Sequence, residues 1–167
     1  MKEDILKNLI TILDNEIELY VQMKDHYVEK KHLLTENKIL ELSNIDTKII
    51  ENYETIKNLD LKRVNIIKLL EEDVPSMTKL IEVCKTGHCD KRIILKLTEQ
   101  KERLASLSSE ITLLNITNMK LIRHGIIIND KQLGTIINAF APKGNSYSGE
   151  GKQISSESKM STIIEDV

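Results

Sequence analysis

The sequence predicts an all-α fold, an elongated antiparallel helical bundle, and three observations carry this prediction. Apolar residues recur at alternating steps of three and four from residue 90 to about residue 128, as they do in a coiled coil. Only 3% of the 167 residues are aromatic and none is Trp, a composition that suits a bundle filled with Ile and Leu. No alternation of period two continues for more than a few residues, so nothing in the pattern predicts a strand.

The longest periodic stretch carries a single apolar stripe, which we call the seam. The seam consists of Leu97, Gln100, Leu104, Leu107, Ile111, Leu114, Asn118, Leu121, Gly125 and Ile128. A helix of about 40 residues is roughly 60 Å long at ~1.5 Å per residue. It cannot bury a stripe of that length against itself, so partner helices must cover it.

Two long helices before this stretch are the predicted partners. Apolar spacing predicts the first over residues 4–35 and the second over about 38–73, where Pro75 stops it. Between them Asn37 is either the C-terminal residue of the first helix or the N-cap of the second. Two helices of similar length joined by so short a break are expected to form an antiparallel hairpin.

A short helix is predicted next, with Ser76 as its N-cap and an end at Thr86 and Gly87. The long helix follows it. The apolar pattern of that helix loosens at Asp130, which either caps a new turn or lies within the helix, and it resumes as far as Phe140.

The composition changes abruptly after Phe140, where Gly, Ser and Pro replace the apolar periodicity. A segment this poor in apolar residues cannot offset the entropy of ordering its backbone. We therefore predict a helical domain of residues 1–140 and a disordered, flexible C-terminal tail of residues 141–167.

Charge and cysteine usage exclude several classes of function. The 24 basic and 26 acidic residues are interspersed and give a net charge of −2, so we expect no nucleic-acid partner. The apolar runs are far shorter than the ~20 residues that cross a bilayer, so no membrane insertion is expected. The acidic N-terminus lacks the apolar core of a secretion signal, and two cysteines suggest reduced thiols in a cytoplasm.

No catalytic or metal site is expected. The cluster Cys84, His88 and Cys89 offers three ligands at most, whereas a structural zinc site needs four, and the remaining histidines are isolated. Carboxylates are expected on solvated helix faces, without the concave pocket that a nucleophile and its base require. The sequence thus predicts a protein that is not an enzyme, with no metal and no cofactor; a metal-dependent regulator or enzyme built on this cluster stays as an alternative.

Asn118 stands in the seam where Leu and Ile are the rule. A buried Asn at such a position costs stability but fixes the register and the partner of the helix. The alternative is that the seam turns outward to solvent at Asn118.

Several stretches, taken in their order along the chain, resemble the FlgN-type flagellar export chaperones. They are residues 9–20, Arg63 with the aliphatic run after it, residues 76–83, Asn115 and Asn118 followed by Leu121 and Ile122, and Tyr147 with Gly151. The loop 84–89 and the Ser-rich end after Lys152 depart from the family.

The resemblance implies a cytoplasmic, non-enzymatic chaperone that binds C-terminal helical segments of flagellar hook-associated (hook–filament junction) proteins. It also implies delivery to the export ATPase complex and the export gate, with Tyr147 as the docking residue. We expect client binding by the last part of the long helix, because the two shorter helices can cover its apolar turns only in part. The residues concerned are Asn118, Leu121, Ile122, Ile126, Ile127, Leu133, Ile136, Ile137 and Phe140. A homodimer is left open, and a structural coiled-coil adaptor of another secretion or cytoskeletal system is the alternative function.

Overall fold

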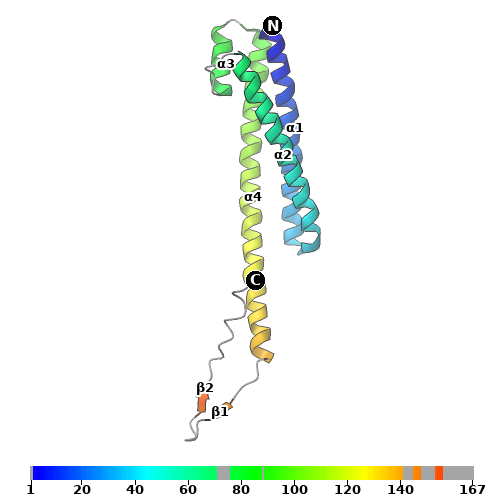
Figure 1. The fold of residues 1–167 in the computed structure, drawn as a ribbon, viewed down its shortest axis with the longest axis vertical. Coiled ribbons are helices and arrows are strands. Elements are labelled where there is room, and N and C mark those ends of the chain that lie inside the picture. The colour runs from blue at the N-terminus through cyan, green and yellow to red at the C-terminus, as the bar shows by residue number, and fades with distance from the viewer. Residues whose placement is uncertain (1, 71–75, 88, 141–144, 148–152, 156–167) are drawn as a thin grey trace. The chain divides into compact units, whose positions relative to one another are not determined.

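Four helices account for most of the chain in this computed structural model, which describes residues 2–70, 76–87, 89–140, 145–147 and 153–155 (Figure 1). The helices are α1 (Lys2–Thr35), α2 (Ile39–Leu70), α3 (Met77–Thr86) and α4 (Lys91–Phe140). Two strands of three residues follow, β1 (Asn145–Tyr147) and β2 (Gln153–Ser155). The predicted all-α helical bundle is confirmed.

The chain divides into two compact units, Met1–Gly125 and Ile126–Val167. The first contains α1, α2, α3 and the N-terminal part of α4. The second contains the last fifteen residues of α4 and both strands. Asp130 lies within α4 and caps no new helix, so the helical pattern runs unbroken to Phe140.

The first two helices form the predicted antiparallel hairpin, and Asn37 makes the turn. Asn37 has a φ of 58°, a left-handed conformation that Asn tolerates better than most residues. The Lys38 amide donates to the Leu33 carbonyl at 2.9 Å, and the Asn37 amide donates to the Leu34 carbonyl at 3.3 Å. These two bonds make a Schellman motif, which assigns Asn37 to the C-terminal side of α1 and not to an N-cap of α2.

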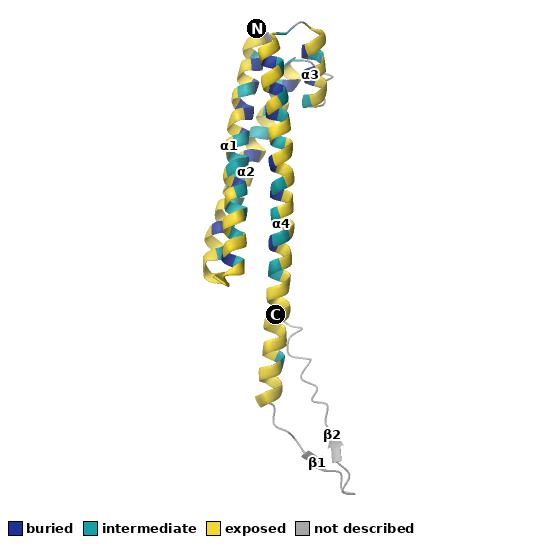
Figure 2. Cartoon of the chain, turned by 180° about the vertical axis from the view of Figure 1, so that it is seen from behind, coloured by how far each residue is buried: buried dark blue, intermediate teal, exposed yellow. Residues whose placement is uncertain are grey.

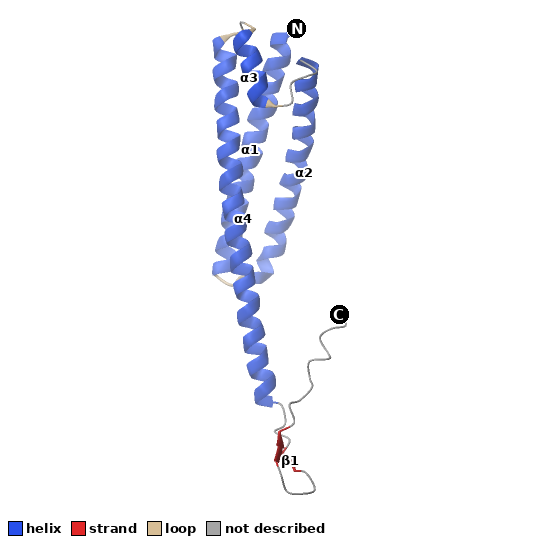
Figure 3. Ribbon diagram, turned by 90° about the vertical axis from the view of Figure 1, so that its left-hand side faces the viewer, coloured by secondary structure: helices blue, strands red, loops and turns tan. Residues whose placement is uncertain are grey.

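Two apolar clusters show how the helices of the first unit run. The larger cluster joins Leu9 of α1, Ile67 of α2 and Leu97 of α4, and α3 adds buried residues to it. The smaller joins Met23, Ile56 and Ile111. Residue numbers therefore rise together along α1 and α4 and fall along α2, the up-down-up order that the sequence predicts (Figure 3).

Side-chain caps define the start of the last two helices. The Ser76 hydroxyl accepts a hydrogen bond from the Lys79 amide at 3.3 Å, as an N-cap does. The Asp90 carboxylate accepts one from the Arg92 amide at 2.9 Å before α4 begins. The predicted cap at Ser76 and the predicted end of α3 at Thr86 and Gly87 are confirmed; Pro75 lies outside the described residues.

The two strands pair in antiparallel fashion, with Ser146 opposite Ile154 and Tyr147 opposite Gln153. The sequence pattern does not predict this pairing. Tyr147 and Ile154 favour extended structure, but three residues give too short a pattern for periodicity to detect.

Candidate functional site

A run of exposed apolar side chains on the last turns of α4 is the most unusual surface of the described chain. We call it the apolar face; it consists of Ile126, Ile127, Leu133, Ile136, Ile137 and Phe140. All six are exposed, and Phe140 most of all at 83%. Figure 2 shows the last turns of α4 coloured as exposed over nearly their whole length. The steps of seven, four and three from Ile126 to Phe140 place Ile126, Leu133, Ile137 and Phe140 on one side of the helix.

Such a surface is rare on a monomeric soluble protein. Exposed apolar residues scattered one by one are ordinary, whereas a contiguous group marks a site where a partner binds. Asp130 and Gln132, two polar residues that lie between these six in the sequence, are exposed as well. The segment therefore presents one apolar stripe, which Asp130 interrupts between Ile126 and Leu133, and a partner helix can cover it.

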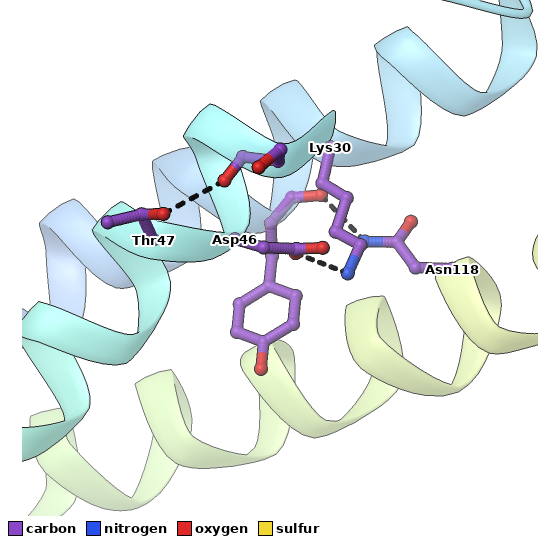
Figure 4. Close-up of polar contacts among 6 residues, drawn as sticks. Lys30, Asp46, Thr47 and Asn118 are labelled. Atoms are coloured by element: carbon purple, nitrogen blue, oxygen red, sulfur yellow. Dashed lines mark hydrogen bonds and ion pairs between the residues drawn. The ribbon is translucent and has the colours of Figure 1, made fainter. Parts of the chain in front are cut away.

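Asn118 lies in a different environment, since only 1% of it is exposed. Its side-chain amide donates a hydrogen bond to the Tyr27 carbonyl of α1 at 3.0 Å (Figure 4). Close by, Lys30 of α1 forms an ion pair with Asp46 of α2 at 2.5 Å. The alternative that the seam turns outward at Asn118 is wrong, because the residue joins α4 to α1.

The seam ends between Leu121 and Gly125. Leu121 and Ile122 are half-buried, while Gly125 is exposed and has no heavy atom within 4 Å of the position a Cβ would occupy. Ile128, the last predicted seam residue, is also exposed. Of the predicted client-binding residues, Asn118 is thus buried, and Leu121 and Ile122 are half-buried. The other six are the exposed residues of the apolar face.

Gln100 is the second polar residue buried in the seam. Its side-chain amide donates to the Ile10 carbonyl at 2.9 Å and to an Asp14 carboxylate oxygen at 2.8 Å. Partial burial tends to raise the pKa of Asp14, but the bonds from Gln100 and Lys96 outweigh it, and the pKa lies below its ordinary value. Gln100 and Asn118 therefore fix α4 against α1 at two points along the same stripe.

A buried carboxylate between α1 and α2 escaped the sequence analysis. Glu16 is 2% exposed, and its oxygen lies 3.4 Å from Nε of Arg63, an ion-pair contact without hydrogen-bond geometry. Burial raises the pKa of Glu16 although Arg63, which also contacts Asp60, acts to lower it. The expectation that carboxylates stand on solvated faces is wrong for Glu16. The available signal was its position, three residues after Leu13 on the apolar stripe of α1.

The cysteine cluster lies at the end of α3. Cys84 is buried, Cys89 is half-buried, and His88 is outside the described residues. Across the parts of the chain that the structure describes, no three metal-ligating side chains come together. Among the same residues, no helix is both long and apolar enough to cross a membrane.

Comparison with protein families gives a match over nearly the whole chain. The family model described as FlgN protein matches residues 1–154. The chain belongs to the FlgN family. FlgN proteins are chaperones of flagellum biogenesis, and the resemblance drawn from the sequence is confirmed. The match includes α1 to α4, β1 and the first two residues of β2. Comparisons with curated proteins and with solved structures found no significant match.

Proposed function

We propose that this chain is a cytoplasmic, non-enzymatic chaperone that binds C-terminal helical segments of flagellar hook-associated proteins. It keeps these clients unassembled and delivers them to the flagellar type III export apparatus. FlgN family membership supports the chaperone role in general, and the apolar face of α4 is the observation that supports client binding.

The chemistry of the apolar face suits a helical client. Six exposed Ile, Leu and Phe side chains lie within fifteen residues of a helix and have no Lys or Arg between Leu133 and Phe140. An amphipathic client helix laid along them would remove apolar surface of both partners from water. Burying one such side chain fully contributes about 1.5–3 kcal/mol, so three or four supply favourable free energy that offsets the entropy cost of association.

The remaining predicted client residues have a supporting role in this proposal. Asn118 hydrogen-bonds to α1 and holds the seam of α4 in register, while Leu121 and Ile122 are half-buried next to it. We propose that Leu121 and Ile122 extend the client contact toward the N-terminus of α4 and that Asn118 orients them.

Charged substitutions on the apolar face test client binding. We expect Ile136→Asp or Phe140→Asp to abolish binding of a hook-associated protein, because each places a charge where an apolar client surface must dock. Helicity should stay unchanged, since both residues are exposed. Isothermal titration calorimetry with a purified client, together with far-UV circular dichroism, checks both points.

Two matched controls separate the apolar face from general effects. Thr135→Asp adds the same charge within the same helical segment but on the side opposite Ile126 and Leu133, and Leu40→Asp removes a 97% exposed apolar side chain from α2. Both should bind the client as the wild type does. Normal binding by Ile136→Asp and Phe140→Asp would show that the client docks elsewhere.

Tyr147 is our proposed residue for docking on the export ATPase complex or export gate. It lies in β1 opposite Gln153, within the residues that the family model matches. Tyr is common at binding hot spots because it buries a large area at little rotamer cost. Tyr147→Ala should leave folding and client affinity intact and reduce client secretion by living cells. Normal secretion at normal chaperone abundance would exclude this role.

A further inference from the structure

The turn that ends α3 brings two cysteines together. The Cys89 amide donates a hydrogen bond to the Cys84 carbonyl at 3.2 Å, the long backbone bond found where a helix ends in a Schellman-type turn. Because this bond is 3.2 Å long, the two Cα atoms are no more than about 7 Å apart, which is the upper limit for a disulfide. The equivalent bond at the end of α1 runs from the Lys38 amide to the Leu33 carbonyl. Cys84 therefore corresponds to Leu33 in that turn, and Cys89 corresponds to Lys38.

The two thiols also share a cavity. In such turns the side chains at these two positions usually contact each other. Cys84 is buried in the larger apolar cluster and half-buried Cys89 packs against that cluster. Both line a cavity of about 260 Å³ next to Leu80 and Val83. The backbone bond and the shared cavity thus place the two cysteines next to each other in one turn.

Cys89 faces a second, larger cavity that is open to solvent. Among the described residues, this cavity of about 650 Å³ is lined by Lys85, Lys91, Ile94, Leu95, Thr98 and Cys89. A lining that combines two lysines, a half-buried cysteine and apolar Ile94 and Leu95 suits a small anionic molecule that carries some apolar surface. Cys84 does not line this cavity in the described part of the chain, so a reagent that enters there meets Cys89 first.

We propose that Cys84 and Cys89 form a thiol–disulfide exchange site that reacts with anionic low-molecular-weight disulfides. The Cys89 thiolate attacks one sulfur of the small disulfide, whose S–S bond breaks and releases one small thiolate. The Cys84 thiolate then attacks the Cys89 sulfur and releases the second. The protein loses two electrons, the small disulfide gains them, and the two protons of the protein thiols pass to the two released thiolates. The product is a Cys84–Cys89 disulfide that closes the turn between α3 and α4.

Glutathione disulfide is the probe, applied to the full chain and followed by intact mass spectrometry. The wild type should lose about 2 Da, the mass of the two thiol hydrogens, on forming the internal disulfide. Cys84→Ser should instead stop at the mixed disulfide and gain one glutathione half. Cys89→Ser should stay unmodified, because Cys84 is buried. Circular dichroism confirms that each variant is folded. The proposal would be overturned if the wild type stayed reduced after treatment. It would also be overturned if Cys89→Ser were modified as fast as the wild type.

The lysines provide an independent test. The double substitution Lys85→Gln with Lys91→Gln should slow the reaction with anionic glutathione disulfide several-fold, because it removes the cations beside Cys89. The reaction with uncharged 2-hydroxyethyl disulfide should keep its wild-type rate in the same variant. Equal rates for wild type and double variant with both reagents would exclude the anionic specificity that we assign to the cavity.

Discussion

Three polar side chains, Glu16, Gln100 and Asn118, occupy positions that an apolar residue would fill at less cost. One oxygen of each has no hydrogen-bond partner in the described chain, and a buried polar atom of this kind lowers stability. Gln100 and Asn118 also donate to backbone carbonyls of α1, which only one alignment of the two helices permits. At the scale of the residue, the bundle gives up stability and gains a defined register.

Replacing Asn118 by Leu should raise the free energy of unfolding by about 1 kcal/mol. The substitution removes a buried acceptor without a partner and adds apolar burial, which together exceed the ~1 kcal/mol of the lost hydrogen bond. The matched control is Asn115→Leu, at an exposed position of the same helix, which should change stability by no more than about 0.5 kcal/mol. Urea denaturation measures both. A less stable Asn118→Leu would mean that the amide contributes more than the bond to Tyr27.

Glu16 makes the stability of the bundle depend on pH. Its folded-state pKa lies above the ordinary value of 4.5, so the folded protein binds the proton more tightly than the unfolded chain does. The resulting stabilisation is complete below pH 4.5 and is lost as the pH rises through the raised pKa. Glu16→Gln, which mimics the neutral acid, should therefore gain stability relative to the wild type between pH 4 and pH 7.

Urea unfolding at several pH values measures this difference. Glu18→Gln, on the exposed side of α1, is the matched control for loss of one carboxylate. If the stability of Glu16→Gln fell relative to the wild type as the pH rose, the ion pair with Arg63 would outweigh burial, and our account of this residue would be wrong.

At the scale of the element, most helix boundaries were predictable because each rests on local chemistry. Ser76 and Asp90 cap helices through their own side chains, and Asn37 ends α1 because it adopts a left-handed conformation. The pairing of β1 with β2 was not predictable, since it depends on a contact between two segments of three residues. The partner of buried Glu16 is Arg63, 47 positions away in the sequence, and no local pattern reports such a partner.

Two glycines within α4 give a prediction about this helix. A Cβ at Gly125 or Gly134 would meet no heavy atom within 4 Å, so Ala fits at either position. Ala favours a helix interior over Gly by about 0.8–1.0 kcal/mol. Each Gly→Ala variant should therefore keep more of its helix than the wild type does at the same elevated temperature. Gly87→Ala is the contrast: its Cβ would lie 3.1 Å from the Val83 carbonyl oxygen, and this variant should be less stable. Thermal melts followed by far-UV circular dichroism check all three. Lower helicity in Gly125→Ala would reveal a close neighbour of that residue.

At the scale of the whole molecule, exposed apolar residues occur on every long helix, and two groups of them, on α2 and on the last turns of α4, differ in pattern. On α2 they stand among charged residues, with Lys57 between Tyr53 and Leu61. On the last turns of α4 they gather in the apolar face. The sequence predicted that this segment would be poorly covered, because its helix is longer than either partner. It did not show that the buried seam stops before Gly125.

Hydrogen–deuterium exchange of the full chain, with and without a hook-associated client, tests the central claim most directly. The amides of residues 126–140 belong to exposed helical turns and should exchange quickly in the free protein. Our account predicts that client binding slows their exchange, while the amides around Leu40, Tyr53 and Leu61 of α2 keep their rates. Slower exchange on α2 with no change in residues 126–140 would contradict it.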